Sequence, residues 1–462
     1  MSAGIYIHIP FCKQKCLYCD FVSAKGCDRD MELYEEALLK EIESTEIDEP
    51  VDSVFFGGGT PSVYKVEYIE EILKIIFRKY NIVKDKAEIT IEVNPGTVDY
   101  DKLKRYRAAG INRISIGLQS ADNEELKLLG RIHTYGKFVE TYTEARRAGF
   151  NNINIDLMSA IPYQTVNSFM ETLKKVVKLN PEHISAYSLI IEEGTPFYNK
   201  YGENGEFSDA IPSEETDREM YHMTKTFLKE NGYERYEISN YAKKGYECKH
   251  NIKYWSRDNY YGFGVAAASL VNNLRYSNIS DGDKYIDILL GGKSNRTGIE
   301  GINNTNINEI NADGISHTNI NEINAERINY TNINQINVDG RSHTNIDEIR
   351  DEISEVNKDE QIEEFMFLGL RKMEGISLKE FERLFGKTLR EEYGEIPDRL
   401  ISEGLCEEVI REGDKDIEDI RKYVDKNISK EIYGGIKDNE GYFRLTERGI
   451  DISNSVFVKF MK

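Results

Sequence analysis

The stretch Ile5-Tyr-Ile-His-Ile-Pro-Phe-Cys12-Lys-Gln-Lys-Cys16-Leu-Tyr-Cys19 carries a short apolar run and then three cysteines within eight residues. The β-branched residues of Ile5–Ile9 predict a strand, so the cysteines follow it in a loop. Three thiolates this close together suit a soft metal centre. Three cysteine ligands on a four-iron cube leave one iron open to a substrate or cofactor. The sequence therefore predicts a [4Fe–4S] cluster held by Cys12, Cys16 and Cys19.

Two simpler interpretations of these cysteines remain open, namely a zinc site and three buried structural cysteines. A structural zinc ion needs a fourth Cys or His, for which Cys27 and His8 are the nearest candidates. The chain has 6 cysteines in 462 residues, which is too few for a disulfide scaffold. Clustered cysteines in such a chain indicate metal binding in a reducing, cytoplasmic compartment.

Short apolar runs alternate with helical stretches along the first half of the chain. The predicted strands are Ile5–Ile9, Ser53–Phe56, Glu88–Val93, Arg113–Gly117, Asn152–Leu157 and His183–Leu189. Helical spacing occupies Glu32–Ile42, Ile69–Ile76, Glu125–Leu129, Phe138–Ala148 and Phe169–Leu179. This repetition predicts an α/β fold with a parallel sheet, either open and doubly wound or a partial barrel. In both architectures ligands gather at the carboxyl ends of the strands.

The composition excludes several classes of protein. The 81 acidic and 60 basic residues give a net charge of −21, which argues against nucleic-acid binding because phosphate recognition relies on Lys and Arg. No run of about eighteen apolar residues occurs, so we expect no transmembrane segment. The start of the chain lacks a basic region followed by a long apolar stretch, so we expect no secretory signal.

Three segments are predicted after a core at residues 1–235. Residues 236–295 are rich in aromatic residues and glycine. Residues 296–355 repeat the pattern of Thr305-Asn-Ile-Asn-Glu-Ile-Asn311 every 13 residues and are predicted to be a low-complexity insertion, with stacked short turns as the alternative. Residues 356–462 combine helical patterns with a strand pattern and predict a winged-helix-like α+β domain, whose acidic residues argue against DNA binding.

A second motif follows the apolar run Val54–Phe56. The glycines of Gly57-Gly58-Gly59-Thr60-Pro61 let backbone N–H groups approach a ligand without an intervening Cβ. Polar side chains also follow the later strands, at Glu92, Asn94, Gln119, Arg131 and Asp156. Each alone is as readily a helix cap or a surface ion pair. Together at one edge of a sheet they favour a ligand site, where Arg131 can pair with a carboxylate.

The spacing C-x3-C-x2-C, with Tyr18 before its last cysteine, resembles the cluster loop of the radical S-adenosylmethionine (SAM) superfamily. The resemblance implies a partial (β/α)6 barrel in which the amino and carboxylate groups of SAM chelate the fourth iron. An electron from the cluster then cleaves the sulfonium to a 5′-deoxyadenosyl radical. SAM is implied by the resemblance alone, as is the contact of its amino group with the glycine stretch.

Five stretches narrow the resemblance to the oxygen-independent coproporphyrinogen III oxidase family, and within it to the heme-chaperone branch, HemW. They are Tyr6-Ile-His-Ile-Pro-Phe-Cys12, Phe55-Phe-Gly-Gly-Gly-Thr-Pro61, Ile91-Glu-Val-Asn-Pro95, Ile184-Ser-Ala-Tyr-Ser-Leu189 and Tyr236-Glu-Ile-Ser-Asn240. The residues that the resemblance places at the cofactor are Tyr6, Tyr18, Gly58, Gly59, Thr60, Glu92, Gln119, Arg131 and Asp156.

Two features favour the chaperone branch over the oxidases. The oxidases carry a fourth cysteine two residues after the third, where this chain has Phe21. They also carry a substantial N-terminal extension that helps to enclose the porphyrinogen, whereas this chain starts eleven residues before Cys12.

The stretch His250-Asn-Ile-Lys-Tyr-Trp255 resembles the H-N-x-x-Y-W motif of the chaperone branch, which is associated with heme. His250 would be an axial heme ligand, with Tyr254 and Trp255 stacked on the macrocycle. The alternative is a hydrogen-bonded core histidine. Cys248 is a further candidate thiolate ligand, although a free buried cysteine is commoner. The chain departs from the family at Gly262–Ser269, which contains no histidine, and between Asp156 and Pro162, where the usual glycine is absent.

The resemblance implies a heme chaperone that carries a [4Fe–4S] cluster and SAM and delivers heme to respiratory apoproteins, including membrane-associated ones. One alternative is an oxygen-independent coproporphyrinogen III dehydrogenase of porphyrin biosynthesis, which decarboxylates two propionates by hydrogen abstraction. Another is a radical group-transfer enzyme with a different substrate. Whether the chain is an enzyme, which protein receives the heme and the oligomeric state stay open.

Overall fold

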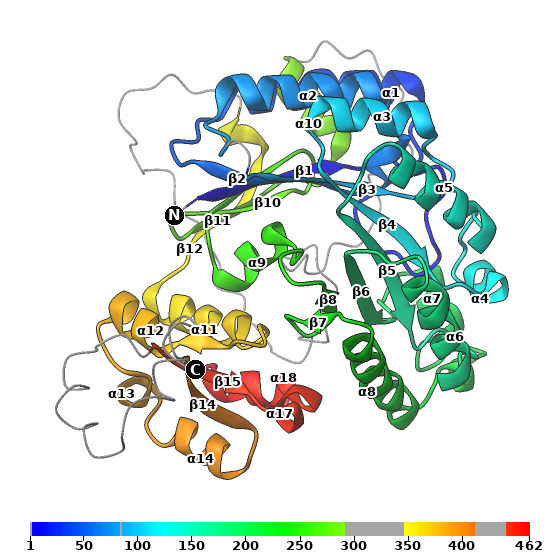
Figure 1. Cartoon of the computed structure of the whole chain (residues 1–462). Coiled ribbons are helices and arrows are strands. Elements are labelled where there is room, and N and C mark those ends of the chain that lie inside the picture. The colour runs from blue at the N-terminus through cyan, green and yellow to red at the C-terminus, as the bar shows by residue number, and fades with distance from the viewer. Residues whose placement is uncertain (1, 84–85, 292–345, 412–439) are drawn as a thin grey trace, which may run out of the picture. The chain divides into compact units, whose positions relative to one another are not determined.

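The computed structural model describes residues 2–83, 86–291, 346–411 and 440–462, which form two compact units (Figure 1). The first unit comprises residues 1–235, 239–254 and 258–356, and the second comprises residues 236–238, 255–257 and 357–462. The predicted aromatic-rich segment is therefore mostly part of the first unit. Most of the predicted Asn-rich insertion lies outside the described residues.

A sheet of twelve strands runs through the first unit in the order β12-β11-β10-β9-β1-β2-β3-β4-β5-β6-β8-β7. Its central strands are parallel and follow the chain order: β1 (Ala3–Ile9), β2 (Val51–Gly58), β3 (Glu88–Val93), β4 (Arg113–Gln119), β5 (Ile153–Ser159) and β6 (His183–Ser188). This arrangement confirms the predicted α/β fold with a partial (β/α)6 barrel.

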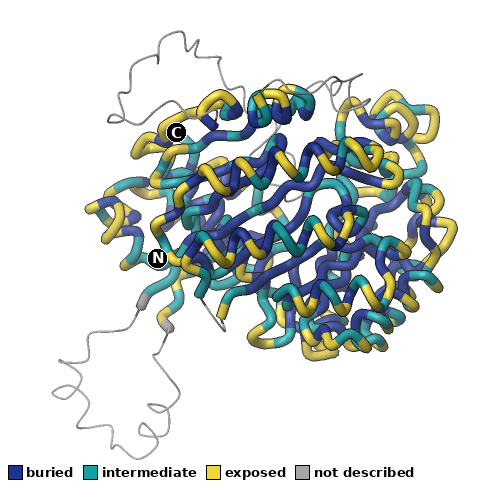
Figure 2. The backbone as a smooth tube through the Cα atoms, turned by 90° about the horizontal axis from the view of Figure 1, so that it is seen from above, coloured by how far each residue is buried: buried dark blue, intermediate teal, exposed yellow. Residues whose placement is uncertain are grey.

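Helices connect the strands and cover one face of the sheet. They are α1 (Asp28–Ser44), α2 (Val66–Lys79), α3 (Tyr100–Ala109), α4 (Asn123–Leu128), α5 (Tyr135–Arg147), α6 (Val166–Val177), α7 (Pro196–Tyr201) and α8 (Glu214–Glu230). Side-chain caps begin several of them, as at Asp99 and Thr165, which satisfy N–H groups of the first turn. Figure 2 shows the central strands buried and the helices exposed on their outer sides.

The alternation of residues along the strands creates two different faces of the sheet. On β4, the side chains of Ile114, Ile116 and Leu118 are fully buried in the core. The strand register places polar residues together on the opposite, inner face: His8, Ser53, Glu88, Glu92, Arg113, Ser115, Gln119, Asn154, Asp156, His183 and Ser185. Strands of a parallel sheet are usually apolar on both faces, so this inner face is built for polar contacts.

Further strands extend the sheet at both edges. On one side lie β9 (Tyr260–Phe263), β10 (Ala268–Val271), β11 (Leu274–Asn278) and β12 (Arg350–Glu355), and on the other β8 (Asn240–Ala242) and β7 (Glu234–Arg235). β12 falls within the range predicted as an insertion, and its antiparallel pairing with β11 incorporates it into the sheet. Helix α10 (Gly282–Leu290) lies on the side of α1, whereas α9 (Lys249–Ser256) lies on the opposite side of the sheet (Figure 1).

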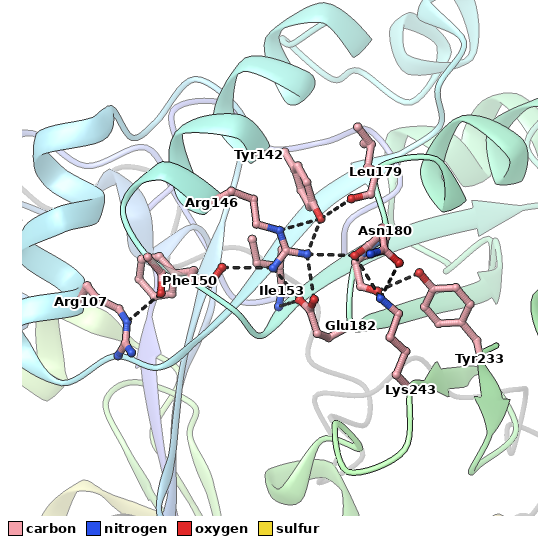
Figure 3. Close-up of polar contacts among 12 residues, drawn as sticks. Arg107, Tyr142, Arg146, Phe150, Ile153, Leu179, Asn180, Glu182, Tyr233 and Lys243 are labelled. Atoms are coloured by element: carbon pink, nitrogen blue, oxygen red, sulfur yellow. Dashed lines mark hydrogen bonds and ion pairs between the residues drawn. The ribbon is translucent and has the colours of Figure 1, made fainter. Parts of the chain in front are cut away.

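Arg146 in α5 ties the helical layer to the loops that enter β5 and β6 (Figure 3). Its guanidinium donates to the two carboxylate oxygens of Glu182 at 2.7 and 3.0 Å and to Phe150 O at 3.1 Å. Glu182 also accepts from Ile153 N–H at 3.1 Å. This paired geometry combines charge with direction, so it fixes where both strands begin.

The second unit is a small α+β domain. Its elements are α11 (Lys358–Gly369), β13 (Ile376–Ser377), α12 (Leu378–Phe385), α13 (Leu389–Tyr393), α14 (Ile396–Ser402), β14 (Cys406–Arg411), β15 (Glu440–Leu445), α17 (Glu447–Asp451) and α18 (Ser453–Phe457). The strands form a sheet in the order β13-β15-β14. Phe365, Phe381 and Phe385 pack together with ring centroids 5.0–5.7 Å apart. None of the helices in the described parts of either unit is long and apolar enough to cross a bilayer.

Candidate functional site

The cysteine loop, residues 12–23, follows the carboxyl end of β1 and is closed at its base by backbone pairing. Cys12 N–H donates to Ala24 O at 2.9 Å, and Ala24 N–H donates to Pro10 O at 2.8 Å. The loop contains no helix or strand of its own. Its shape is therefore set by the elements that it touches.

The middle of the cysteine loop is held at Leu17. Its N–H donates to Leu129 O at 3.2 Å, and its carbonyl accepts from Phe197 N–H at 3.0 Å. The next residue, Tyr18, packs edge-on against the ring of Phe197 with centroids 6.4 Å apart. These contacts fix the loop against the residue that follows α4 and against α7.

His8 on β1 connects the sheet to the last part of the cysteine loop. A carbonyl can only accept, so Nε2–H donates to Val22 O at 2.9 Å, and Nδ1 accepts from the Tyr6 hydroxyl at 3.2 Å. Burial lowers the pKa of His8 to about 4, so the imidazole is neutral. Because both ring nitrogens are occupied, His8 anchors the loop and does not supply the fourth ligand that a zinc site would need.

The other candidate for that fourth ligand, Cys27, is the N-cap residue of α1. Its backbone N–H donates to Asp30 Oδ2 at 2.9 Å, and its side chain belongs to the capping box. Cys27 is exposed. The contacts of Cys27 are therefore those of a residue that begins a helix.

A chain of side-chain hydrogen bonds joins the first two cysteines across the ends of β2, β3 and β4. Thr60 Oγ1 lies 3.4 Å from Cys12 Sγ, and Asn94 Nδ2 donates to the same oxygen at 2.8 Å. Asn94 Oδ1 accepts from Arg131 Nη2 at 2.6 Å, and Arg131 Nη1 reaches Cys16 Sγ at 3.4 Å. The structure thus brings the predicted site residues Cys12, Thr60, Arg131 and Cys16 together. Asn94 links them, because it bonds to both Thr60 and Arg131.

The three cysteines of the loop form no disulfide, and Cys12 is 9% exposed. Burial raises the pKa of Cys12 and raises that of Cys19 to about 12, because a buried thiolate loses hydration. A bound metal would take the place of the thiol proton. Among the described residues, no three His, Cys, Asp or Glu side chains converge on the position of one metal ion.

The glycine stretch after β2 does not present free amides to a ligand, contrary to the interpretation of the sequence. Gly59 N–H donates to Ile9 O at 2.9 Å and Thr60 N–H donates to Phe11 O at 2.8 Å. The reason is that the chains of β1 and β2 stay paired beyond the strand ends. A Cβ on Gly59 would lie 2.9 Å from the carbonyl oxygens of Ile9 and Phe11, so this glycine is needed for close pairing.

Two carboxylates lie on the inner face of the sheet, Glu92 on β3 and Asp156 on β5. Asp156 accepts from Ser115 Oγ at 2.8 Å and from Asn154 Nδ2 at 2.7 Å, while Glu92 accepts from Gly58 N–H. Burial raises the pKa of Asp156. Burial, and then repulsion by the charge of Asp156, raises the pKa of Glu92 to about 8. Hydroxyl or ammonium groups of a ligand are suitable partners for such a pair.

Gln119 ends β4 in the left-handed backbone region, with φ of 69°, where the pairing of β4 with β5 shifts register. Its Oε1 accepts from the Tyr187 hydroxyl at 3.1 Å. Tyr187 was not predicted at the site, although its place on the strand after that of Asp156 was a usable signal. A non-glycine residue in this conformation costs about 1–3 kcal/mol and often marks a ligand site.

An open cavity lies beside the cysteine loop. Its walls include Lys13, Cys16, Asn94, Arg131 and Ile132. Ile132 is 60% exposed at this wall. The cavity therefore combines a thiol, hydrogen-bonding groups and an apolar side chain at the carboxyl ends of the strands.

His250, the first residue of the H-N-x-x-Y-W motif, lies at the opposite ends of the strands. At the start of α9, the N–H groups of Lys249 and His250 donate to the Glu88 carboxylate at 3.3 and 3.4 Å. His250 is 1% exposed, with Nδ1 3.0 Å from Ser53 Oγ and Nε2 2.9 Å from the Tyr254 hydroxyl oxygen. Glu88 begins β3, and five residues of strand separate Ser53 from the end of β2, about 17 Å. The structure therefore does not bring His250 to the cysteine loop.

The neighbours of His250 are buried too. The Cys248 thiol donates to Glu88 Oε1 at 3.4 Å, and burial raises its pKa to about 12. Trp255 belongs to the second unit, where the guanidinium of Arg371 lies 4.3 Å from its ring centroid. Burial lowers the pKa of His250 to about 3, so this imidazole is neutral.

Comparison with known proteins identifies the superfamily and then the family. The model of the Radical SAM superfamily matches residues 6–176, and that of the HemN C-terminal domain matches residues 356–408. A protein of Lactococcus lactis named heme chaperone HemW is 31% identical over 456 residues, covering 99% of this chain and 96% of that protein. The chain belongs to the HemW family. Another HemW protein, from Bacillus subtilis, is 31% identical over 404 residues, covering 87% of this chain and 91% of its own length.

The fold of this HemW-family chain is also that of a solved enzyme structure. Coproporphyrinogen III oxidase (HemN) from Escherichia coli superimposes with a TM-score of 0.70 at 20% identity, covering 99% of this chain and 90% of HemN. The likeness extends to both units and confirms the predicted architecture.

Radical SAM membership implies a [4Fe–4S] cluster and SAM for the HemW family, and the residues present fit both. Three unpaired thiols on one loop are the ligand set that such a cluster with an open iron uses. The adjacent cavity offers a guanidinium for a carboxylate, and the inner face offers acceptors for hydroxyl groups. Among the predicted cofactor residues, His250 lies toward the other ends of the strands, where its ring stacks on that of Tyr6 with centroids 6.4 Å apart.

We predict that Gly58→Ala destabilises the protein by more than Gly232→Ala does. Both glycines have positive φ, 104° and 85°, so each alanine is expected to cost about 1–2 kcal/mol of backbone strain. A Cβ at position 58 would also lie 2.6 Å from the ring of His8, whereas position 232 is open. The overlap is expected to add on the order of 2 kcal/mol, measured as the difference in the free energy of unfolding by denaturant. Equal losses would contradict the packing of His8 on Gly58.

We predict that Glu92→Gln stabilises the cluster-free protein at pH 8.5 and leaves it nearly unchanged at pH 5. The folded pKa of about 8 lies above the unfolded value of 4.5, so the folded state binds an extra proton in that window and loses stability as pH rises through it. The melting temperature at the two pH values, with exposed Glu140→Gln on α5 as the control, measures the effect. A shift of the same size at both pH values for Glu92→Gln would contradict the raised pKa.

Proposed function

We propose that the chain is a cytoplasmic heme chaperone that carries a [4Fe–4S] cluster and SAM, binds heme and delivers it to respiratory apoproteins. The observation that carries the proposal is the cysteine loop with its hydrogen-bonded partners Thr60, Asn94 and Arg131. Relatives that carry the name heme chaperone align with 87% and 99% of this chain, which supports the heme part of the proposal.

In this proposal Cys12, Cys16 and Cys19 hold the cluster and the neighbouring strand ends hold SAM. When bound, the cluster would supply the electron that cleaves the sulfonium of SAM. The amides of Gly59 and Thr60 are bonded to Ile9 and Phe11, so carbonyl oxygens of the glycine stretch would be the groups left to accept hydrogen bonds from the amino group of SAM. Arg131 would pair with the carboxylate of SAM.

The inner face supplies the remaining SAM contacts. Glu92 and Asp156 would accept hydrogen bonds from hydroxyl groups of SAM, and Gln119 is oriented by the Tyr187 hydroxyl. Tyr6 acts through His8, because its hydroxyl is bonded to the imidazole. Tyr18 on the cysteine loop packs against Phe197, and burial raises its pKa and keeps it neutral.

Heme ligation by His250 requires a change at α9. Both imidazole nitrogens are bonded, to Ser53 and Tyr254, and the ring is stacked on Phe55 with centroids 5.2 Å apart. The neutral imidazole has the protonation state that iron ligation needs. In the proposal His250 binds heme iron through Nε2 once the bond to the Tyr254 hydroxyl is broken.

We predict that His250→Ala weakens hemin binding about tenfold or more, whereas Tyr254→Phe strengthens it about threefold, since the lost hydrogen bond is worth roughly 0.5–1.5 kcal/mol. Titration of hemin into the protein, followed by the Soret absorption, measures both. His222→Ala, at a half-buried position of α8, is the control and should bind hemin as the unsubstituted protein does. Unchanged binding in His250→Ala would place the heme ligand elsewhere.

The rival function is coproporphyrinogen III oxidation. This chain shares the fold of HemN, so the fold alone does not distinguish the two functions. In this chain Phe21, 43% exposed in the cysteine loop, occupies the place of the oxidases' fourth cysteine. With the cluster loaded, coproporphyrinogen III, SAM and a reductant are expected to yield no protoporphyrinogen. Formation of that product with repeated turnover would replace the chaperone proposal by the oxidase.

A further inference from the structure

We infer that Asn94 is a positioning residue that directs two hydrogen bonds, one from Thr60 and one from Arg131, onto the sulfurs of Cys12 and Cys16, and thereby raises the reduction potential of the cluster. The inference rests on the proposed function, because it takes these cysteines as cluster ligands. Asn94 itself touches neither sulfur, and its effect passes through the two donors.

The direction of each bond around Asn94 is fixed by chemistry. The guanidinium of Arg131 can only donate, so the atom of Asn94 that lies 2.6 Å from Nη2 is the oxygen Oδ1. The amide nitrogen Nδ2 then faces Thr60 Oγ1 at 2.8 Å and donates to it. The opposite orientation would place two donors against each other at Arg131.

This orientation also fixes the hydroxyl of Thr60. Its oxygen accepts from Asn94, so its hydrogen is available for Cys12 Sγ at 3.4 Å, and a thiolate can only accept. On the other side, Arg131 uses Nη2 for Asn94 Oδ1 and for Gly117 O at 2.7 Å. Nη1 is thereby turned to Cys16 Sγ at 3.4 Å.

Asn94 is itself held in place by its backbone. Its N–H donates to Ser62 Oγ at 3.2 Å, and its carbonyl accepts from the Thr97 hydroxyl at 2.7 Å. Gly117 leaves room for the bridge, because a Cβ there would lie 3.0 Å from Asn94 Oδ1 and 3.1 Å from Arg131 Nη2. The bridge is therefore a fixed feature of the strand ends.

Hydrogen bonds to the sulfurs of an iron–sulfur cluster help to set its potential. Reduction adds one negative charge to the cluster, and donors to its sulfurs stabilise the more negative state. Two aligned donors therefore make the cluster easier to reduce. Loss of their alignment is expected to shift the potential to more negative values without loss of the iron.

Asn94→Asp tests the bridge with almost no change of shape. A carboxylate oxygen in place of Nδ2 cannot donate, so the Thr60 hydroxyl turns to it and leaves Cys12. Thr60→Val removes the same hydrogen bond without adding charge, and Thr60→Ser keeps the hydroxyl as the matched control. Asn94→Leu removes the bridge without adding charge.

The measurement is the midpoint potential of the reconstituted cluster by dithionite titration monitored by electron paramagnetic resonance (EPR). Asn94→Asp, Asn94→Leu and Thr60→Val are expected to shift it to lower potential, and Thr60→Ser to leave it unchanged. The double variant of Asn94→Asp and Thr60→Val should shift by less than the sum of the single shifts, because both remove one shared bond.

Pulsed EPR in deuterated water provides a readout that is independent of charge. The coupling of an exchangeable proton near the cluster should be lost in Thr60→Val and in Asn94→Asp and retained in Thr60→Ser. Additive shifts, or an unchanged potential and coupling in Asn94→Asp, would overturn the inference. So would failure of both Asn94 variants to load iron while their circular dichroism is native. Absence of a cluster from the unsubstituted protein would instead refute the proposed function.

Discussion

The geometry of the cysteine loop depends on the pairing of β1 with β2, which continues past the ends of both strands. Gly59 and Thr60 donate to Ile9 and Phe11, and this carries the chain of β2 alongside the residues that lead into Cys12. The loop has no regular structure of its own, so the paired strands are its template. His8 adds a second attachment at Val22.

The two faces of the sheet have different roles: the outer face contributes to stability and the inner face offers groups for ligand binding. The outer face is apolar and packs under helices, while the inner face carries polar side chains that bond to one another, such as Ser115 with Asp156 and His183 with Asn154 at 2.6 Å. Mutual bonding of buried polar groups avoids the penalty of leaving them unpaired. The site at the carboxyl ends and the His250 motif at the amino ends are thus two separate places on one face.

Much of the fold was predictable from residue patterns. The alternation of strand and helix placed the central strands correctly, with Glu88–Val93 identical in bounds and β1 and β2 extended by a few residues. The edge strands were harder because they are short and contain turn-forming residues, as in Leu274–Asn278. β12 could not be recognised from the sequence, because its residues, Arg350–Glu355, are mostly acidic and largely exposed at a sheet edge and so lack a strand-like apolar pattern.

The sequence predicted which strand-end residues form the site, but it did not predict the hydrogen bonds among them. Spacing pointed to Cys12, Cys16 and Cys19, and strand ends pointed to Arg131 and Asp156. Which groups bond to which depends on the register between strands, and single-sequence patterns do not contain it. The glycine stretch shows the same limit, since its amides could be assigned to the neighbouring strand only once that strand was placed. His250 was a candidate iron ligand by residue type, and its present bonds to Ser53 and Tyr254 could not be predicted from the sequence.

The central claim is that the cysteine loop binds a four-iron cluster. The most direct measurement is the iron, sulfide and zinc content of protein purified without oxygen, for the unsubstituted chain, for the Ala variants of Cys12, Cys16 and Cys19, and for Cys27→Ala as the control. We expect about four irons and an absorption band near 400 nm in the unsubstituted chain and in Cys27→Ala, and a strong loss of iron in the other three variants. Stoichiometric zinc, or no metal in the unsubstituted chain, would contradict it.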